Sequence, residues 1–275
     1  MRATPAGSGG TPPVHQRGPR PGLKLGRRWH WLVFYGLILL AWAVLIVAHM
    51  GAADLRAARD TFGAAVWSAL CAPVEGGSSV LALVPMWMLM AAAMMAPTLV
   101  PALRTYDDFV AGQLSGRRDF LTFLGGYLAV WAVASFIGAT AQLALLRLDL
   151  IDPLGQSVSL WLNAGLLMMA GLYQFSPVKD ACLTACRRPM VFFMQHWEEG
   201  PWRMGLRMGV LCLACCWALM LLAFVGGMLA IGWMALAAAL MTLEKMPDLG
   251  RWVTWPLGAG LIAAGLTTAV AAPLI

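Results

Sequence analysis

Long apolar segments, separated by short charged or polar ones, dominate this sequence. A helix needs roughly 20 apolar residues to cross the hydrocarbon core of a bilayer, and seven segments approach or reach that length. The uncharged stretch between Arg207 and Glu244 is too long for one crossing, so we divide it at Gly226 and Gly227. The predicted spans are Trp31 to Met50, Val80 to Leu103, Phe120 to Leu146, Val158 to Phe175, Met208 to Val225, Gly226 to Leu243 and Trp252 to Leu274.

The composition supports an all-α, polytopic membrane helix bundle. Hydrophobic residues make up 60% of the chain and charged residues 12%, whereas soluble domains carry about 25% charged residues. The basic residues are divided among short segments, so the chain offers no basic face that could bind nucleic acid. We therefore expect the lipid bilayer to surround a single transmembrane domain over residues 29–275, preceded by a disordered basic tail over residues 1–28.

The distribution of Lys and Arg predicts the orientation. With the N-terminus in the cytoplasm, all of the nineteen basic residues except Arg56, Arg59 and Arg147 lie on the cytoplasmic side. Positively charged loops stay on that side, so this asymmetry favours about seven spans with a cytoplasmic N-terminus. We therefore predict a multi-pass protein located in the bacterial inner membrane.

Several kinds of chemistry are disfavoured by the residues that the predicted spans contain. No ionisable residue lies deep within a span, which disfavours a proton-coupled transporter. None of the four His residues lies near mid-membrane, so a transmembrane bis-histidine haem lacks ligands. The sequence contains no P-loop, kinase or nucleophile-elbow motif. We assign no catalytic residue and favour a non-enzymatic role.

A group of Met residues occupies the second predicted span. Met86, Met90 and Met94 recur every four residues and therefore follow one helical face, and Met95 is adjacent to them. Their thioethers are soft metal ligands, although Met is also a common apolar filler of helix cores.

Five Cys residues form two further groups. Cys212, Cys215 and Cys216 have the spacing i, i+3, i+4, which places their thiols in one sector of the fifth predicted span. Cys182 and Cys186 share one face of a short helix predicted between Pro177 and Pro189. Soft thiolates and thioethers select Cu(I), with Zn(II) as an alternative at a site built only from thiolates. Each Cys could instead be a small buried hydrophobe.

Basic residues flank the Cys182 and Cys186 pair. Lys179, Arg187 and Arg188 lie within a few residues of these thiols. A neighbouring positive charge favours the thiolate, so we expect this pair to ionise readily.

The sequence resembles a bacterial family of predicted metal-binding integral membrane proteins, a domain of unknown function that is sometimes labelled copper chaperone. The matching blocks are Met86 to Met88, Ala93 to Pro97, Tyr173-Gln174 with Pro177 and Lys179, Cys182-Leu183, Cys186-Arg187 with Pro189, Cys215 to Met220, Trp233-Met234 and Glu244-Lys245. The resemblance implies that the protein binds a metal, with copper expected, through these Cys and Met residues.

Three functional hypotheses follow. The leading one is a membrane protein that binds or transfers Cu(I) for copper homeostasis or metalloenzyme assembly, with a copper chaperone or a cuproenzyme subunit as partner. The second is a membrane thiol-disulfide oxidoreductase, because Cys212 and Cys215 form a C-x-x-C pair. The third is a structural or assembly subunit that holds no metal.

Overall fold

The computed structural model describes residues 29–49, 79–110, 116–152, 155–228 and 230–274. The chain divides into two compact units, residues 1–36 and residues 37–275. Helix α1 (Trp29–His49) includes the boundary between them. The tail predicted over residues 1–28 lies outside the described residues and stays a prediction.

The described chain is all-helical, as predicted, and contains one isolated β-bridge between Ile151 and Ser157. After α1, the helices are α4 (Val80–Val110), α5 (Gly116–Arg147), α6 (Leu160–Gln174), α7 (Pro177–Arg187), α8 (Pro189–His196), α9 (Gly200–Leu221), α10 (Ala223–Gly226), α11 (Ile231–Glu244) and α12 (Gly250–Ala271). Two short 3₁₀ helices, η3 (Trp197–Glu199) and η4 (Ala272–Leu274), follow α8 and α12.

Five helical stretches of the described chain are long and apolar enough to cross a membrane. They lie within α1, α4, α5, the run from α8 to α10, and α12. Helices α6 and α11 occupy the fourth and sixth predicted spans, but they contain only 15 and 14 residues. At 1.5 Å per residue each is roughly 20 Å long, shorter than a hydrocarbon core of about 30 Å. The count of seven spans and their orientation therefore stay predictions.

Two predicted breaks are present in the structure. Helix α10 ends at Gly226, and Gly227 adopts φ 94°, a left-handed conformation that favours glycine. The short helix predicted between Pro177 and Pro189 is α7, whose first residue is Pro177. The Ser176 side chain caps it by accepting a hydrogen bond from the Val178 amide at 3.2 Å.

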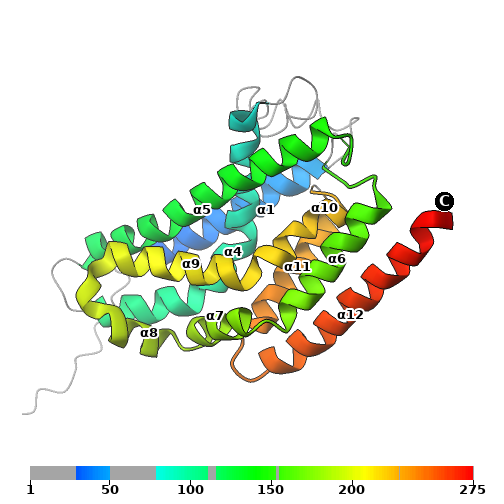
Figure 1. The fold of residues 1–275 in the computed structure, drawn as a ribbon. Helices are drawn as coiled ribbons and strands as arrows, with labels where there is room; N and C mark the ends of the chain where they lie inside the picture. Colours follow the sequence, from blue (N-terminus) through cyan, green and yellow to red (C-terminus); the bar gives the residue numbers. More distant parts are fainter. Residues whose placement is uncertain (1–28, 50–78, 111–115, 153–154, 229, 275) are drawn as a thin grey trace, which may run out of the picture. The chain divides into compact units, whose positions relative to one another are not determined.

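Helix α9 lies in the centre of the group formed by α5, α7 and α9. It packs along α5 on one side and against α7 on another, while α6 packs along α12 (Figure 1). Glycines permit the close approach of α5 and α9: a Cβ at Gly205 would clash with the Phe123 carbonyl, and one at Gly126 with the Trp202 carbonyl. Small residues are typical of such close contacts between membrane helices.

Proline residues inside α4 free backbone carbonyls, and one of them has a visible partner. Pro97 has no amide hydrogen, so the carbonyl of Ala93, four residues earlier, lacks its usual helical donor. The indole nitrogen of Trp42 donates to that carbonyl at 3.0 Å. A side chain from a neighbouring helix therefore satisfies part of the freed backbone of α4.

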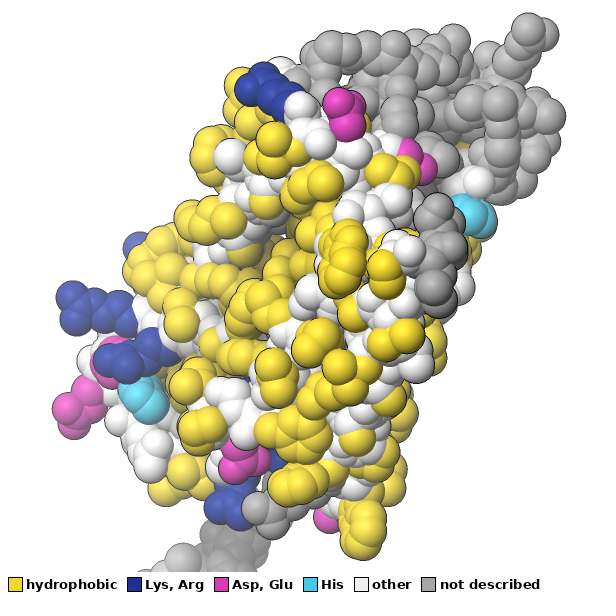
Figure 2. All heavy atoms as spheres, turned by 45° about the vertical axis from the view of Figure 1, so that its right-hand side comes forward, with side chains coloured by type: hydrophobic (Ala, Val, Ile, Leu, Met, Phe, Trp, Pro, Cys, Tyr) yellow, Lys and Arg dark blue, Asp and Glu magenta, His cyan; other side chains and the backbone are white. Residues whose placement is uncertain are grey.

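The surface agrees with a membrane environment. Most of the face in Figure 2 is hydrophobic, and the Lys, Arg, Asp and Glu side chains gather toward its ends. Many large apolar side chains are exposed in the described chain, including Leu81 on α4, Ile137 on α5 and Trp255 on α12. Contact with lipid suits such side chains, whereas their exposure to water would cost free energy.

Candidate metal centre

The central feature of the candidate site is a group of three buried thiols on α9. Cys212, Cys215 and Cys216 are each at most 3% exposed. The thiols of Cys215 and Cys216 both donate to the backbone carbonyl of Cys212, at 3.0 Å and 2.9 Å. The i, i+3, i+4 spacing thus places the three side chains together, as the sequence predicts.

A thioether from α4 joins these thiols. The Met95 Sδ lies 3.5 Å from the Cys216 Sγ and 4.0 Å from the Cys212 Sγ. Met95 is 1% exposed, so the contact is fully enclosed by protein. Two helices that are more than a hundred residues apart in the sequence therefore place three sulfur atoms together.

The predicted methionine stripe lies elsewhere on α4. Met86, Met90 and Met94 are buried, but the sulfur contacts described above belong to Met95. Consecutive helical residues differ by about 100° around the axis, so Met94 points in another direction from Met95. The structure thus brings Met95 to the cysteines, and the ligand roles predicted for Met86, Met90 and Met94 stay predictions.

Helix α7 adds the second thiol pair to the same cluster. The side chains of Cys186 and Cys215 are close enough to interact, and Cys215 also influences Cys182 electrostatically. Cys182 is buried, whereas Cys186 is half-buried. In the structure, the two cysteine groups predicted from the sequence are therefore neighbours.

The expected ionisation of the α7 pair is wrong. The hydrogen bond with Cys215, together with burial, raises the pKa of the Cys186 thiol well above its usual value. Burial and the neighbouring Cys215 raise the pKa of Cys182. The reason is that the flanking cations point elsewhere: Lys179 binds Glu244, and Arg187 binds a backbone carbonyl.

Two polar side chains that we did not predict as site residues, Lys245 and Tyr127, contact the Cys212 sulfur, and Thr98 binds Lys245. The Lys245 Nζ donates to the Cys212 Sγ at 3.1 Å and to the Thr98 Oγ1 at 2.8 Å. The Tyr127 hydroxyl lies 3.2 Å from the same sulfur. Burial opposes a charged Lys245, but the sulfurs of Cys212, Cys215 and Cys216 outweigh this and raise the pKa of Lys245 well above its usual value. The sequence signal that could have identified Lys245 as a site residue was the Glu244-Lys245 block of the family resemblance.

A buried ion pair fixes the end of α11 from which Lys245 extends. Lys179 and Glu244 are each 1% exposed, and the Lys179 Nζ lies 2.9 Å from the Glu244 Oε2. Lys179 also donates to Gln174 at the end of α6. Arg187 donates from Nε and Nη2 to the Glu244 carbonyl, at 2.8 Å and 2.6 Å. Charged, hydrogen-bonded contacts thus hold the residue directly before Lys245.

The donor set decides which metal the cluster could hold. No group of three or more His, Cys, Asp or Glu side chains within the described ranges is arranged to hold a metal ion. Three sulfurs are nevertheless close when the thioether is included, and a thioether favours soft Cu(I) over Zn(II). Metal–sulfur bonds of about 2.3 Å in a trigonal arrangement separate the sulfurs by roughly 4 Å. The separations of 3.5 Å and 4.0 Å from Met95 fit that requirement.

Comparison with known proteins identifies a family. Neither a curated protein nor a solved structure is similar enough to the chain to count as a match. Residues 84–268 match the family described as copper chaperone PpoB2, and this range contains Met95, the cysteines on α7 and α9, and Lys245. Because the match covers well over half of the sequence, this chain belongs to the PpoB2 copper chaperone family.

Proposed function

We propose that this membrane protein binds Cu(I) as cargo through the Cys212 and Cys216 thiolates and the Met95 thioether, and passes it on for copper homeostasis or metalloenzyme assembly. The observation that carries the proposal is the buried contact between Met95 and these two cysteines. Cu(I) is held well by two or three soft sulfur ligands.

The charges of the site support the same cargo. Cu(I) with two thiolates has a net charge of −1, which is costly in a buried environment without a partner. The Lys245 ammonium lies 3.1 Å from the Cys212 Sγ and supplies one positive charge. A loaded site of two thiolates, one thioether and Lys245 is therefore neutral.

The α7 cysteines supply a path for copper exchange. Cys186 is the half-buried thiol of the cluster, it contacts Cys215, and Cys215 is adjacent to Cys216 in the sequence. Copper can move along such a series when a new thiolate binds before the previous one leaves, so that the ion keeps its sulfur ligands. In this proposal Cys186 exchanges copper with a partner, which is a copper chaperone or a cuproenzyme subunit.

The proposed topology determines which partner can reach Cys186. With seven spans and a cytoplasmic N-terminus, α7 lies at the cytoplasmic surface of the inner membrane. The basic residues Lys179, Arg187 and Arg188 support this side, because positive charge is retained there. Copper then exchanges with a cytoplasmic protein at α7.

Metal analysis of detergent-purified protein from copper-supplemented cells tests the proposal. We expect near-stoichiometric copper in the wild type, loss of copper when Cys212, Cys215 and Cys216 are all changed to Ser, and reduced copper in Met95→Leu. Met90→Leu is the matched control, because Met90 is equally buried on α4 and Met-to-Leu nearly conserves volume. Equal copper in all four proteins would overturn the assignment of these ligands.

The contact between Cys186 and Cys215 also favours a second candidate, a thiol-disulfide oxidoreductase. The described cysteines are all free thiols in this structure. Trapping of thiols in intact cells separates the two functions: an oxidoreductase shows a Cys186–Cys215 disulfide that forms and disappears during turnover, whereas a copper carrier keeps both thiols reduced.

A further inference from the structure

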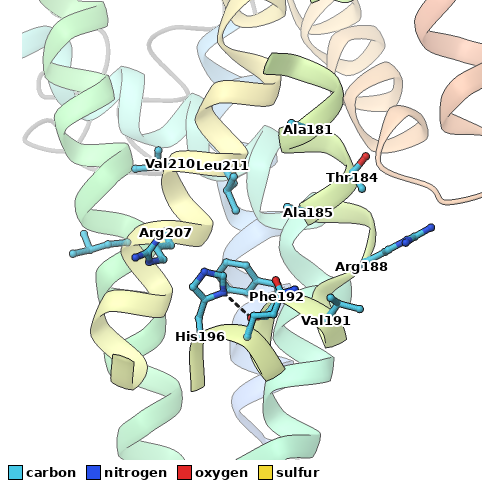
Figure 3. A pocket seen from close by; sticks show the side chains of 12 residues that line it. Ala181, Thr184, Ala185, Arg188, Val191, Phe192, His196, Arg207, Val210 and Leu211 are labelled. Atoms are coloured by element: carbon cyan, nitrogen blue, oxygen red, sulfur yellow. Dashed lines mark hydrogen bonds between the residues drawn. The ribbon is translucent and has the colours of Figure 1, made fainter. Parts of the chain in front are cut away.

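A groove on the α7–α8–α9 surface is lined by none of the residues of the metal centre. It has a volume of about 620 Å³ and lies between α7, α8 and the first half of α9. Figure 3 shows the side chains that line it. Apolar residues form most of the wall, among them Ala185, Val191, Phe192, Val210 and Leu211.

Three basic side chains line the same groove. Arg188 lies between α7 and α8, His196 ends α8, and Arg207 comes from the opposite side on α9. The His196 ring rises from α8, and its Nδ1 donates to the Phe192 carbonyl at 2.9 Å (Figure 3). Arg207 makes an ion pair from Nε to Glu199 at 2.6 Å, which uses one of the five donors of a guanidinium. Apolar walls and cationic groups thus occur in one depression.

The surface beside this groove is apolar, as expected next to lipid. Helix α8 buries Phe192 and Phe193, but it exposes Met190 and Met194 on its other side. The stretch from Pro189 to Gly226 is long and apolar enough to cross a membrane, and the groove lies beside its first turns. Apolar exposure next to basic residues is typical of segments in the interface between water and hydrocarbon.

We propose that this groove binds an anionic phospholipid. The acyl chain packs against Val191, Leu206 and Val210, and Arg207, beside His196, binds the phosphate-containing headgroup, while Arg188 attracts it from the other rim of the groove. A lipid explains both halves of the groove, since its tail requires the apolar wall and its headgroup requires the cations. An acidic peptide would satisfy the cations but would leave the wall and the exposed Met190 and Met194 uncovered.

Native mass spectrometry of the delipidated full chain tests this inference. The probes are phosphatidylglycerol and phosphatidylcholine with identical acyl chains, and glycerol phosphate serves as a headgroup without a tail. Wild type should prefer phosphatidylglycerol. Arg188→Gln and Arg207→Gln should each weaken the binding of phosphatidylglycerol about fivefold, since a basic residue near a membrane surface contributes roughly that factor. Phosphatidylcholine binding should not change, and glycerol phosphate alone should not bind.

Arg203→Gln is the matched control, because Arg203 is also exposed on α9 but does not line the groove. Copper content should stay at the wild-type level in all three variants, which separates this site from the metal centre and shows that the proteins are folded. The inference is overturned if wild type binds both lipids equally, if Arg203→Gln weakens phosphatidylglycerol as much as the groove variants do, or if glycerol phosphate or an acidic peptide displaces the bound lipid.

Discussion

Replacement of Lys245 by Met removes the positive charge closest to the proposed copper ligands. Its Nζ lies 3.1 Å from the Cys212 Sγ, and at an effective dielectric constant of about 20 two unit charges at that distance interact by roughly 5 kcal/mol. Because Lys245 is half-buried, solvent screens part of this interaction, and we take about half of it. A loss of about 2 to 3 kcal/mol corresponds to Cu(I) binding that is roughly 30- to 150-fold weaker.

Competition with a chromophoric Cu(I) chelator measures this affinity in purified protein. Lys245→Arg is the control, because it keeps the charge and a donor for the Cys212 sulfur. We expect Lys245→Arg to stay within a few fold of wild type, and its thermal unfolding shows whether the α11 end is intact. The reasoning is refuted if Lys245→Met binds Cu(I) as tightly as wild type, or if Lys245→Arg loses as much affinity as Lys245→Met.

Further predictions concern the scaffold and the second thiol pair. Glu244→Gln leaves the Lys179 charge buried without a partner and should lower the free energy of unfolding by about 3 to 5 kcal/mol in denaturant titrations, whereas a Lys179→Met, Glu244→Met double variant should recover much of that loss. Gly205→Ala forces α5 and α9 apart and should cost about 1 to 3 kcal/mol; Gly232→Ala, which meets open space in α11, should be neutral or slightly stabilising, and equal effects would contradict the glycine contact. Because the pKa of Cys182 is raised, its alkylation at neutral pH should be slow, and the alkylation rate should still increase with pH above about 8.5, the usual thiol pKa. Mass spectrometry that shows a rate already constant below that pH would contradict this prediction.

The helical fold could be predicted because hydropathy, glycine and proline act locally. The all-helical class, the break after Gly226 and the short α7 after Pro177 all follow from such local rules. The bounds of each span are harder to predict, because hydropathy gives the length of an apolar segment but not the residue at which a helix begins. The apolar segments around α6 and α11 include residues in turns, so each helix is shorter than its apolar segment.

The candidate site was partly predictable for a related reason. Spacing shows which residues share a face of one helix, so the grouping of Cys212, Cys215 and Cys216 could be predicted. Spacing does not show which face of a helix meets a neighbouring helix. It therefore could not distinguish contact of the cysteines with Met95 from contact with the stripe of Met86, Met90 and Met94. Lys245 follows an apolar segment and resembled a topology signal; its contact with Cys212 depends on how α11 packs against α9.

The glycines and cysteines of α9 belong to one stripe. Gly205, Gly209, Cys212 and Cys216 follow each other at helical spacing, so they lie along the same side of the helix. At the glycine end the α5 and α9 backbones touch, whereas one turn further on Cys212 has room for its own sulfur and for the Tyr127 hydroxyl. The glycines therefore set the closest approach of the two helices, and the cysteine sulfurs lie further along the same side of α9. A methyl group added at Gly205 would therefore change how α5 packs beside the proposed copper ligands, two to three turns away, without touching any of them.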